Sequence, residues 1–242
     1  SDKEVIDYEL IIKDLETTDK RLDKIQKQAV VGDKEKKIEC DILLNCKSHL
    51  ENGKNLRNLE LEDNELKWIK HLNLITIKPL IYVANIDESI IKEDNNHVKK
   101  LEVIAEKENL KIIKICASLE EQLYDLNDDE KLLFLDDYGI KDSGLDRLIN
   151  ASYDTLRLIT YFTAGEKEVR AWTVKNGSTA PKAAGVIHTD FEKGFIKAEV
   201  ISYNDYINYG SELKCKESGK LSIEGKDYIV NDGDIMHFRF NV

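Results

Sequence analysis

A largely polar tetrapeptide, Asn85-Ile86-Asp87-Glu88, directly follows the apolar run from Leu80 to Ala84. In open α/β sheets, ligands bind beyond the carboxyl ends of the strands, and this tetrapeptide stands at such an end. The amide of Asn85 can pair with the N6 and N7 edge of adenine, and the carboxylate of Glu88 can accept from an exocyclic amine. The pattern indicates a purine-binding loop, and an ordinary polar turn between a strand and a helix is the alternative.

The loop that would hold the phosphates of such a nucleotide is absent from the 242 residues. A P-loop requires the pattern G-x-x-x-x-G-K-[ST], because backbone N–H groups, a lysine and a Mg²⁺-bound hydroxyl must converge on the phosphates. The Gly-Lys pairs at Gly53, Gly219 and Gly225 lack both the upstream glycine and the following Ser or Thr. The sequence therefore predicts base recognition without a phosphate site.

The region around the tetrapeptide alternates strand and helix patterns. A short helix at 63–73 precedes a strand at 76–84, and a second strand is expected at 111–116. This alternation predicts a parallel sheet covered by helices. Two parallel strands cannot bury both faces of a sheet, so we expect partner strands to be missing. The remaining helices are expected at 98–106, 119–126, 130–138 and 145–158.

The first sixty residues carry the pattern of two amphipathic helices. Apolar or small residues recur at alternating steps of three and four from Tyr8 to Ala29, which predicts a long helix with an apolar seam. Asp33 is expected to cap a second helix that stops near Gly53. Together the two helices are expected to form an antiparallel hairpin.

The tip of this hairpin is basic, although the net charge of the chain is −11. A cluster of cations can neutralise nucleic-acid phosphates even on an acidic protein, so the tip is a candidate RNA-binding surface. A solvated charged turn is the alternative. The cations are Lys20, Arg21, Lys24, Lys27, Lys34, Lys36 and Lys37, against Asp23, Asp33 and Glu35.

Beyond Tyr161 the sequence becomes richer in glycine and β-forming residues, which predicts a separate small α+β domain. Strands are expected at 168–174, 195–202, 228–230 and 235–240, with one short helix near 181–187. His188, Asp190 and Glu192 are expected to fix a tight turn by backbone hydrogen bonds rather than to act in acid–base or metal chemistry. The paired aspartates Asp128-Asp129 and Asp136-Asp137 suggest a carboxylate-dependent hydrolase only weakly, because solvated helix surfaces normally carry such pairs.

Composition restricts the class of protein further. The cysteines Cys40, Cys46, Cys116 and Cys215 lack C-x-x-C spacing, so we expect reduced packing residues and no metal site. No apolar run reaches 18 residues, and the first ten residues lack the order of a signal peptide. A cytoplasmic monomer that binds neither DNA nor a membrane is expected.

Several segments resemble a known family. VANIDE (83–88) and the segment from Lys114 to Ser118 are similar to the fourth and fifth nucleotide-binding motifs of the Obg-like ATPases, the YchF family. Ile86 and Glu88 stand where the Asn-Lys-x-Asp motif of guanine-specific GTPases has Lys and Asp. The segments 161–174, 179–200 and 224–242 resemble the TGS domain that closes YchF proteins, and the hairpin resembles their coiled-coil insertion.

The resemblance implies three parts: the helical (coiled-coil) hairpin at 1–62, the distal part of a P-loop nucleotide-binding α/β domain at 63–158, and a small β-grasp-like TGS domain at 159–242. It also implies a ribosome-associated ATPase that prefers ATP to GTP, with Mg²⁺ as cofactor in the intact protein and ribosomal RNA as partner. The implied base-binding residues are Asn85, Ile86, Glu88, Cys116 and Ala117. Without a P-loop, this chain is expected to be inactive alone, with no nucleotide cofactor and no catalytic residue of its own; a non-enzymatic RNA- or protein-binding module is the alternative.

Overall fold

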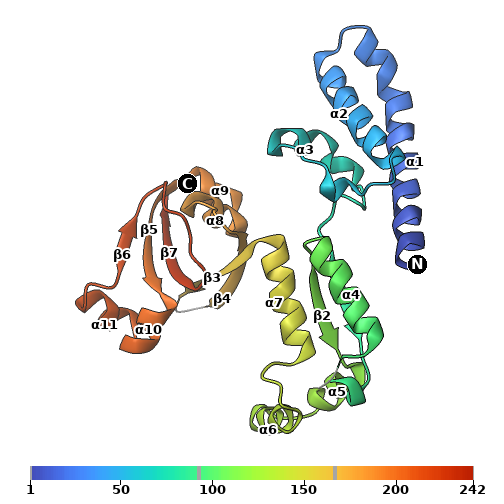
Figure 1. The fold of residues 1–242 in the computed structure, drawn as a ribbon. Helices are drawn as coiled ribbons and strands as arrows, with labels where there is room; N and C mark the ends of the chain where they lie inside the picture. The colour runs from blue at the N-terminus through green and yellow to red at the C-terminus, as the bar shows by residue number, and fades with distance from the viewer. Residues whose placement is uncertain (1, 92–93, 166–167, 242) are drawn as a thin grey trace. The chain divides into compact units, whose positions relative to one another are not determined.

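The computed structural model describes residues 2–91, 94–165 and 168–241. The chain divides into two compact units, Ser1–Leu80 and Ile81–Val242. The first unit is helical, and the second combines helices with two sheets (Figure 1). The expected mixed α/β architecture with an N-terminal helical hairpin is confirmed. Among the described residues, no helix has the length and apolar character that crossing a bilayer would require.

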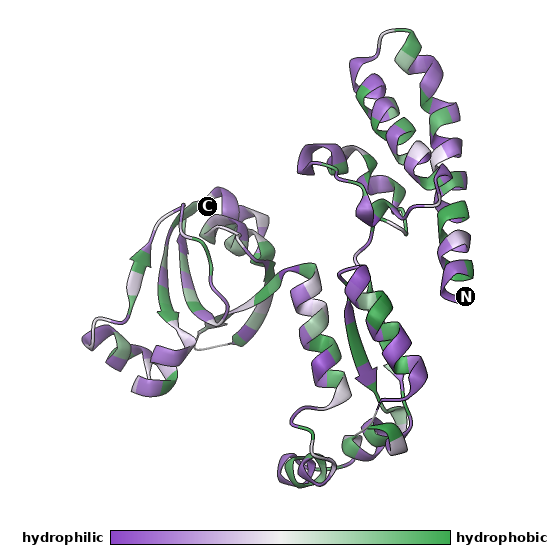
Figure 2. Cartoon of the chain, in the orientation of Figure 1, coloured by the Kyte–Doolittle hydropathy of each residue, from purple (hydrophilic) through white to green (hydrophobic). Residues whose placement is uncertain are grey.

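The first unit is built on two antiparallel helices, α1 (Asp2–Val30) and α2 (Lys34–Glu51), which lie side by side. Asp33 caps α2 as expected, because its carboxylate accepts from two backbone N–H groups of the first turn. Hydrophilic and hydrophobic residues alternate along both helices (Figure 2), and the apolar seam buries Leu22, Ile25 and Leu43. Burial of this seam holds the hairpin together.

Short helical segments close the open end of the hairpin: η1 (Leu56–Asn58), α3 (Asp63–Ile69) and η2 (Lys70–Leu72). The predicted strand at 76–84 is wrong in its first half. Thr76 is fully buried, and its backbone N–H and hydroxyl both donate to the carboxylate of Asp14, at 2.7 Å each. The carboxylate thus takes the backbone N–H that Thr76 would use in a strand, and the carbonyl of Thr76 accepts from the N–H of Arg57 at 2.9 Å, so this residue forms a turn instead.

The second unit begins with a two-stranded parallel sheet, β1 (Ile81–Asn85) and β2 (Lys111–Ile115), as the sequence predicts. Helix α4 (Asn96–Lys107) connects the strands, and α7 (Gly144–Leu156) also packs against the sheet. The remaining segments are η3 (Glu88–Ile90), α5 (Ala117–Tyr124) and α6 (Asp128–Tyr138).

The described residues of the C-terminal part form a five-stranded mixed sheet from β3 (Leu158–Ala164), β4 (Val169–Lys175), β5 (Phe195–Ser202), β6 (Ser222–Glu224) and β7 (Asp234–Phe240). The strand order is β4-β3-β7-β5-β6. Its pairs are antiparallel except β3 with β7. Tyr161 is fully buried in the core of this sheet and donates its hydroxyl to the carbonyl of Ala183 at 2.9 Å. The helices of this part are α8 (Ala180–Ile187), α9 (Thr189–Lys193), α10 (Tyr203–Tyr209) and α11 (Glu212–Glu217).

Three further predictions in this unit need correction. The helix expected at 145–158 stops at Leu156, because Arg157 adopts a left-handed φ of 53° and β3 begins at the next residue. The expected strand at 228–230 is reduced to one isolated bridge between Thr179 and Ile229. Where the sequence predicts a single helix in the C-terminal part, the described residues form four, since α9, α10 and α11 follow α8.

Candidate functional site

The carboxyl edge of the parallel sheet brings most of the predicted base-binding residues together. Asn85 is in register with Ile115, and the backbone N–H of Ile86 donates to the carbonyl of Ile115 at 2.8 Å. Cys116 and Ala117 come next after β2, so they follow the sheet at the same edge as Asn85 and Ile86. The side chain of Asn85 is exposed, whereas Ile86 is half-buried and packs against the cluster around Cys116.

Glu88 lies at this edge of the sheet, and its carboxylate accepts hydrogen bonds from three side chains. Its Oε1 accepts from the Ser118 hydroxyl at 3.0 Å and from the Gln122 amide at 3.2 Å, and its Oε2 accepts from the Tyr138 hydroxyl at 3.5 Å. Burial and the charge of Glu88 raise the pKa of Tyr138, as expected for a phenol that donates to a carboxylate. The donors come from α5 and α6, so Glu88 links the loop after β1 to both helices.

An apolar cluster supports the edge from beneath. Cys116, Leu119, Leu123 and Leu135 are buried together and fix α5 and α6 against the loop. Polar contacts add to this support, because Lys114 pairs with Asp94 at 2.7 Å and the guanidinium of Arg147 donates to the carbonyl of Lys114 at 3.0 Å. The carboxylate of Glu120 accepts from the N–H of Gly144, at the start of α7, at 2.6 Å.

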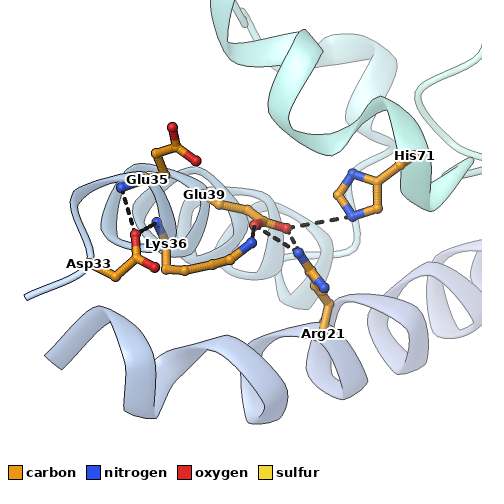
Figure 3. A network of polar contacts seen from close by, with 6 residues as sticks. All are labelled: Arg21, Asp33, Glu35, Lys36, Glu39 and His71. Carbon is orange, nitrogen blue, oxygen red and sulfur yellow. Dashed lines mark hydrogen bonds and ion pairs between the residues drawn. The ribbon is translucent and has the colours of Figure 1, made fainter. Parts of the chain in front are cut away.

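The predicted RNA-binding cations at the tip of the hairpin fall into two groups, those bound to Glu39 and those with exposed side chains. The guanidinium of Arg21 donates to both carboxylate oxygens of Glu39, at 2.6 and 2.8 Å, and the ammonium of Lys36 donates to Oε2 at 3.1 Å (Figure 3). His71 approaches the same carboxylate at 3.5 Å. The other five cations, Lys20, Lys24, Lys27, Lys34 and Lys37, have exposed side chains.

Glu39 is a buried charge whose environment keeps it ionised. Its side chain is only 3% exposed. Burial raises the pKa of Glu39, but the hydrogen bonds and positive charges of Arg21 and Lys36 outweigh burial, so that the pKa lies below its usual value. Arg21 and Lys36 therefore compensate a charge inside the protein.

Sequence reasoning missed the residues that organise both regions. Ser118, Gln122 and Tyr138 had no assigned role, although Ser118 and Gln122 are four apart and so share a helix face. Glu39 was also missed. It could have been recognised as the one acidic residue among the apolar positions of the α2 seam.

His188 and the cysteines make local contacts. His188 Nδ1 accepts from the backbone N–H of Asp190 at 3.1 Å and thereby caps α9. All four cysteines are free and buried. Burial raises the pKa of Cys46 to about 11, so this thiol stays protonated at neutral pH.

Comparison with known proteins identifies the family to which this chain is similar. Residues 158–241 match the YchF-GTPase C-terminal family model, described as "Protein of unknown function (DUF933)". The chain is similar to two proteins named "Ribosome-binding ATPase YchF". It is 50% identical to that of Pasteurella multocida over 241 residues and 46% identical to that of Bacillus subtilis over 243 residues. Each match covers 100% of this chain and 66% of the relative's length, so the chain spans about two thirds of these relatives.

Solved structures agree. The Schizosaccharomyces pombe YchF GTPase superposes with a TM-score of 0.84 at 34% identity, covering 97% of this chain and 64% of that one. A GTP-binding protein from Pyrococcus horikoshii OT3 shares the fold, with a TM-score of 0.61 at 19% identity over 99% of this chain and 71% of its own. The chain thus belongs to the YchF family and corresponds to its C-terminal portion.

Proposed function

We propose that this chain is the distal part of a ribosome-associated, YchF-type ATPase. The observation that carries the proposal is its 50% identity, along the whole chain, to a protein named for ribosome binding and ATPase activity. In this proposal, residues 1–62 are a coiled-coil insertion, 63–158 the distal part of the nucleotide-binding domain, and 159–242 a TGS domain of β-grasp type. The intact protein would act in the cytoplasm as a monomer.

The purine of ATP would bind at the carboxyl edge of β1 and β2. Asn85, Ile86 and Glu88 would surround it on one strand end, and Cys116 and Ala117 on the other. The exposed amide of Asn85 offers both a donor and an acceptor, which is what the N6 and N7 edge of adenine requires. ATP would be preferred to GTP, and Mg²⁺ would accompany the nucleotide in the intact protein.

The 242 residues alone should not hydrolyse ATP. Phosphoryl transfer depends on positioning and electrostatic stabilisation around the phosphates and Mg²⁺, and no P-loop is present to supply them. A few base contacts of roughly 1 kcal/mol each would give millimolar binding at best. We expect phosphate release equal to a protein-free blank; release above the blank that Asn85→Ala removes would contradict the proposal.

Ribosomal RNA would contact the exposed lysines of the hairpin tip, together with the TGS domain. Arg21 and Lys36 would have a structural role instead, because both bind Glu39. We expect a variant in which Lys24, Lys27, Lys34 and Lys37 are all changed to Glu to co-sediment more weakly with ribosomes. Its binding should also depend less steeply on salt concentration. Loss of each phosphate contact removes roughly one counterion from the salt slope.

A matched control reverses four other exposed lysines, Lys99, Lys100, Lys107 and Lys141. This variant has the same net charge as the tip variant, so a general electrostatic effect would weaken both equally. Equal co-sedimentation of the tip variant and the unmodified chain, at every salt concentration, would remove the hairpin from the ribosome contact.

A further inference from the structure

The carboxylate of Glu88 has little capacity left for a ligand. An ionised carboxylate oxygen has two main acceptor sites, and those of Oε1 are taken by Ser118 at 3.0 Å and Gln122 at 3.2 Å. Tyr138 approaches Oε2 at 3.5 Å. Three donors from α5 and α6 therefore hold a side chain that lies only three residues beyond Asn85.

Packing does not require these three contacts. Helices α5 and α6 are already fixed by Leu119, Leu123 and Leu135, whereas Glu88, Ser118 and Gln122 are exposed. The hydrogen bonds to the Glu88 carboxylate join exposed side chains outside this apolar cluster, so the packing of the two helices does not depend on them. Their main effect is to set the direction of the Glu88 carboxylate.

That direction matters because adenine and guanine respond oppositely to a carboxylate. Guanine presents two adjacent donors, N1–H and N2–H₂, which a free carboxylate accepts together. Adenine presents one donor, at N6, beside the lone pair of N1, which a carboxylate repels. A free Glu88 next to the Asn85 amide would favour guanine, and a Glu88 bound to α5 and α6 removes that preference.

We propose that Ser118, Gln122 and Tyr138 are specificity-determining residues: residue 88 still flanks the base, but these three donors hold its carboxylate out of hydrogen-bonding reach of the base edge, and so make the slot accept adenine. The inference rests on the proposed purine site. It differs from a direct reading of the base by Glu88, because here the three residues act as positioning residues through Glu88.

The test compares binding of AMP and GMP to the 242-residue chain by ligand-observed saturation-transfer NMR at millimolar nucleotide. The test variant combines Ser118→Ala with Gln122→Leu, which removes both donors to Oε1. The control combines Glu121→Gln with Tyr124→Phe, two exposed positions on the same helix. We expect the ratio of the two dissociation constants to shift about tenfold toward GMP in the test variant, the effect of one charge-assisted hydrogen bond, and to stay unchanged in the control.

Adding Glu88→Gln to the test variant should abolish the gain for GMP, since an amide cannot accept from both guanine donors. An unchanged ratio with an unchanged melting temperature would overturn the inference while leaving the purine site in place. Proportional loss of both nucleotides would overturn it as well, because the contacts would then be only structural. Binding of neither nucleotide to the unmodified chain would instead refute the purine site, and the inference with it.

Discussion

Glu39 changes the role that can be assigned to the cations around it. Seven cations at the tip of the hairpin resemble a single RNA-binding patch in the sequence. The structure assigns Arg21 and Lys36 to a carboxylate that is 3% exposed, and leaves the lysines around them exposed. A buried carboxylate without such partners would be costly, so these two cations stabilise the hairpin.

The linkage between Glu39 and pH follows from its lowered pKa. A carboxyl group with a lower pKa in the folded state binds fewer protons when folded, so the contribution of Glu39 to the free energy of unfolding is complete above the ordinary pKa of a glutamate. That contribution is lost as the pH falls through the folded pKa.

We expect Glu39→Gln to lower the free energy of unfolding by about 2 kcal/mol at neutral pH, since Arg21 and Lys36 lose a charged acceptor. The difference between the variant and the unmodified chain should shrink below pH 4. Urea unfolding at a series of pH values measures both effects, and a difference that stays constant down to pH 3 would contradict the role given to Glu39. Glu35→Gln, at an exposed position of the same helix, is the control.

At the scale of elements, the sequence is most informative where periodicity and end signals agree. The hairpin was predictable because a run of alternating three- and four-residue steps ends at Gly32 and Asp33. The end of α7 was not, because Arg157 adopts a left-handed conformation that normally marks a glycine. Helix α10 was missed because its sequence, YNDYINY, is poor in strong helix formers, although Ser202 caps it.

Asp33, the N-cap of α2, should contribute measurably to the stability of the hairpin. Its carboxylate accepts from the N–H groups of Glu35 and Lys36, both at 3.1 Å. We expect Asp33→Ala to lower the free energy of unfolding by about 1 kcal/mol, the usual value of an N-cap, whereas Asp41→Ala, at an exposed position inside α2, should change it by less than about 0.5 kcal/mol. Denaturant titration followed by helical circular dichroism measures both. Equal effects would show that the cap contributes nothing.

The candidate site was partly predictable for a similar reason. Strand ends are local features, so the rule that ligands bind beyond the carboxyl ends of parallel strands was enough to single out Asn85. Cys116 was assigned only through the family resemblance. The contacts of Glu88 with Gln122 and Tyr138 span 34 and 50 residues. Such pairings depend on how helices pack, which no local pattern specifies.

At the scale of the whole molecule, the two compact units each contain one of the two tryptophans. Trp68 packs against the core of the first unit, and Trp172 packs against the core of the C-terminal sheet. Fluorescence of each tryptophan, isolated by changing the other to Phe, can therefore follow the unfolding of its own unit.

Asp14 offers the variant for this experiment. Its carboxylate is 2% exposed and accepts three hydrogen bonds from Ile75 and Thr76. We expect Asp14→Ala to destabilise the Trp68 transition by about 3 kcal/mol, because buried donors lose their acceptor, and to leave the Trp172 transition in place. Glu16→Ala, at an exposed position of the same helix, should change neither. Equal shifts of both transitions after Asp14→Ala would mean that the units unfold together.

The contact between Asp14 and Thr76 also bears on what happens if the polypeptide is nicked. Residues 31–33, between α1 and α2, are exposed, so a protease can cut there. The severed N-terminal peptide would still be bound to the rest of the chain. Asp14 would keep its hydrogen bonds to residues 75–76, and Leu22 and Ile25 would stay in the apolar core. The two pieces should co-elute in gel filtration and part only in denaturant.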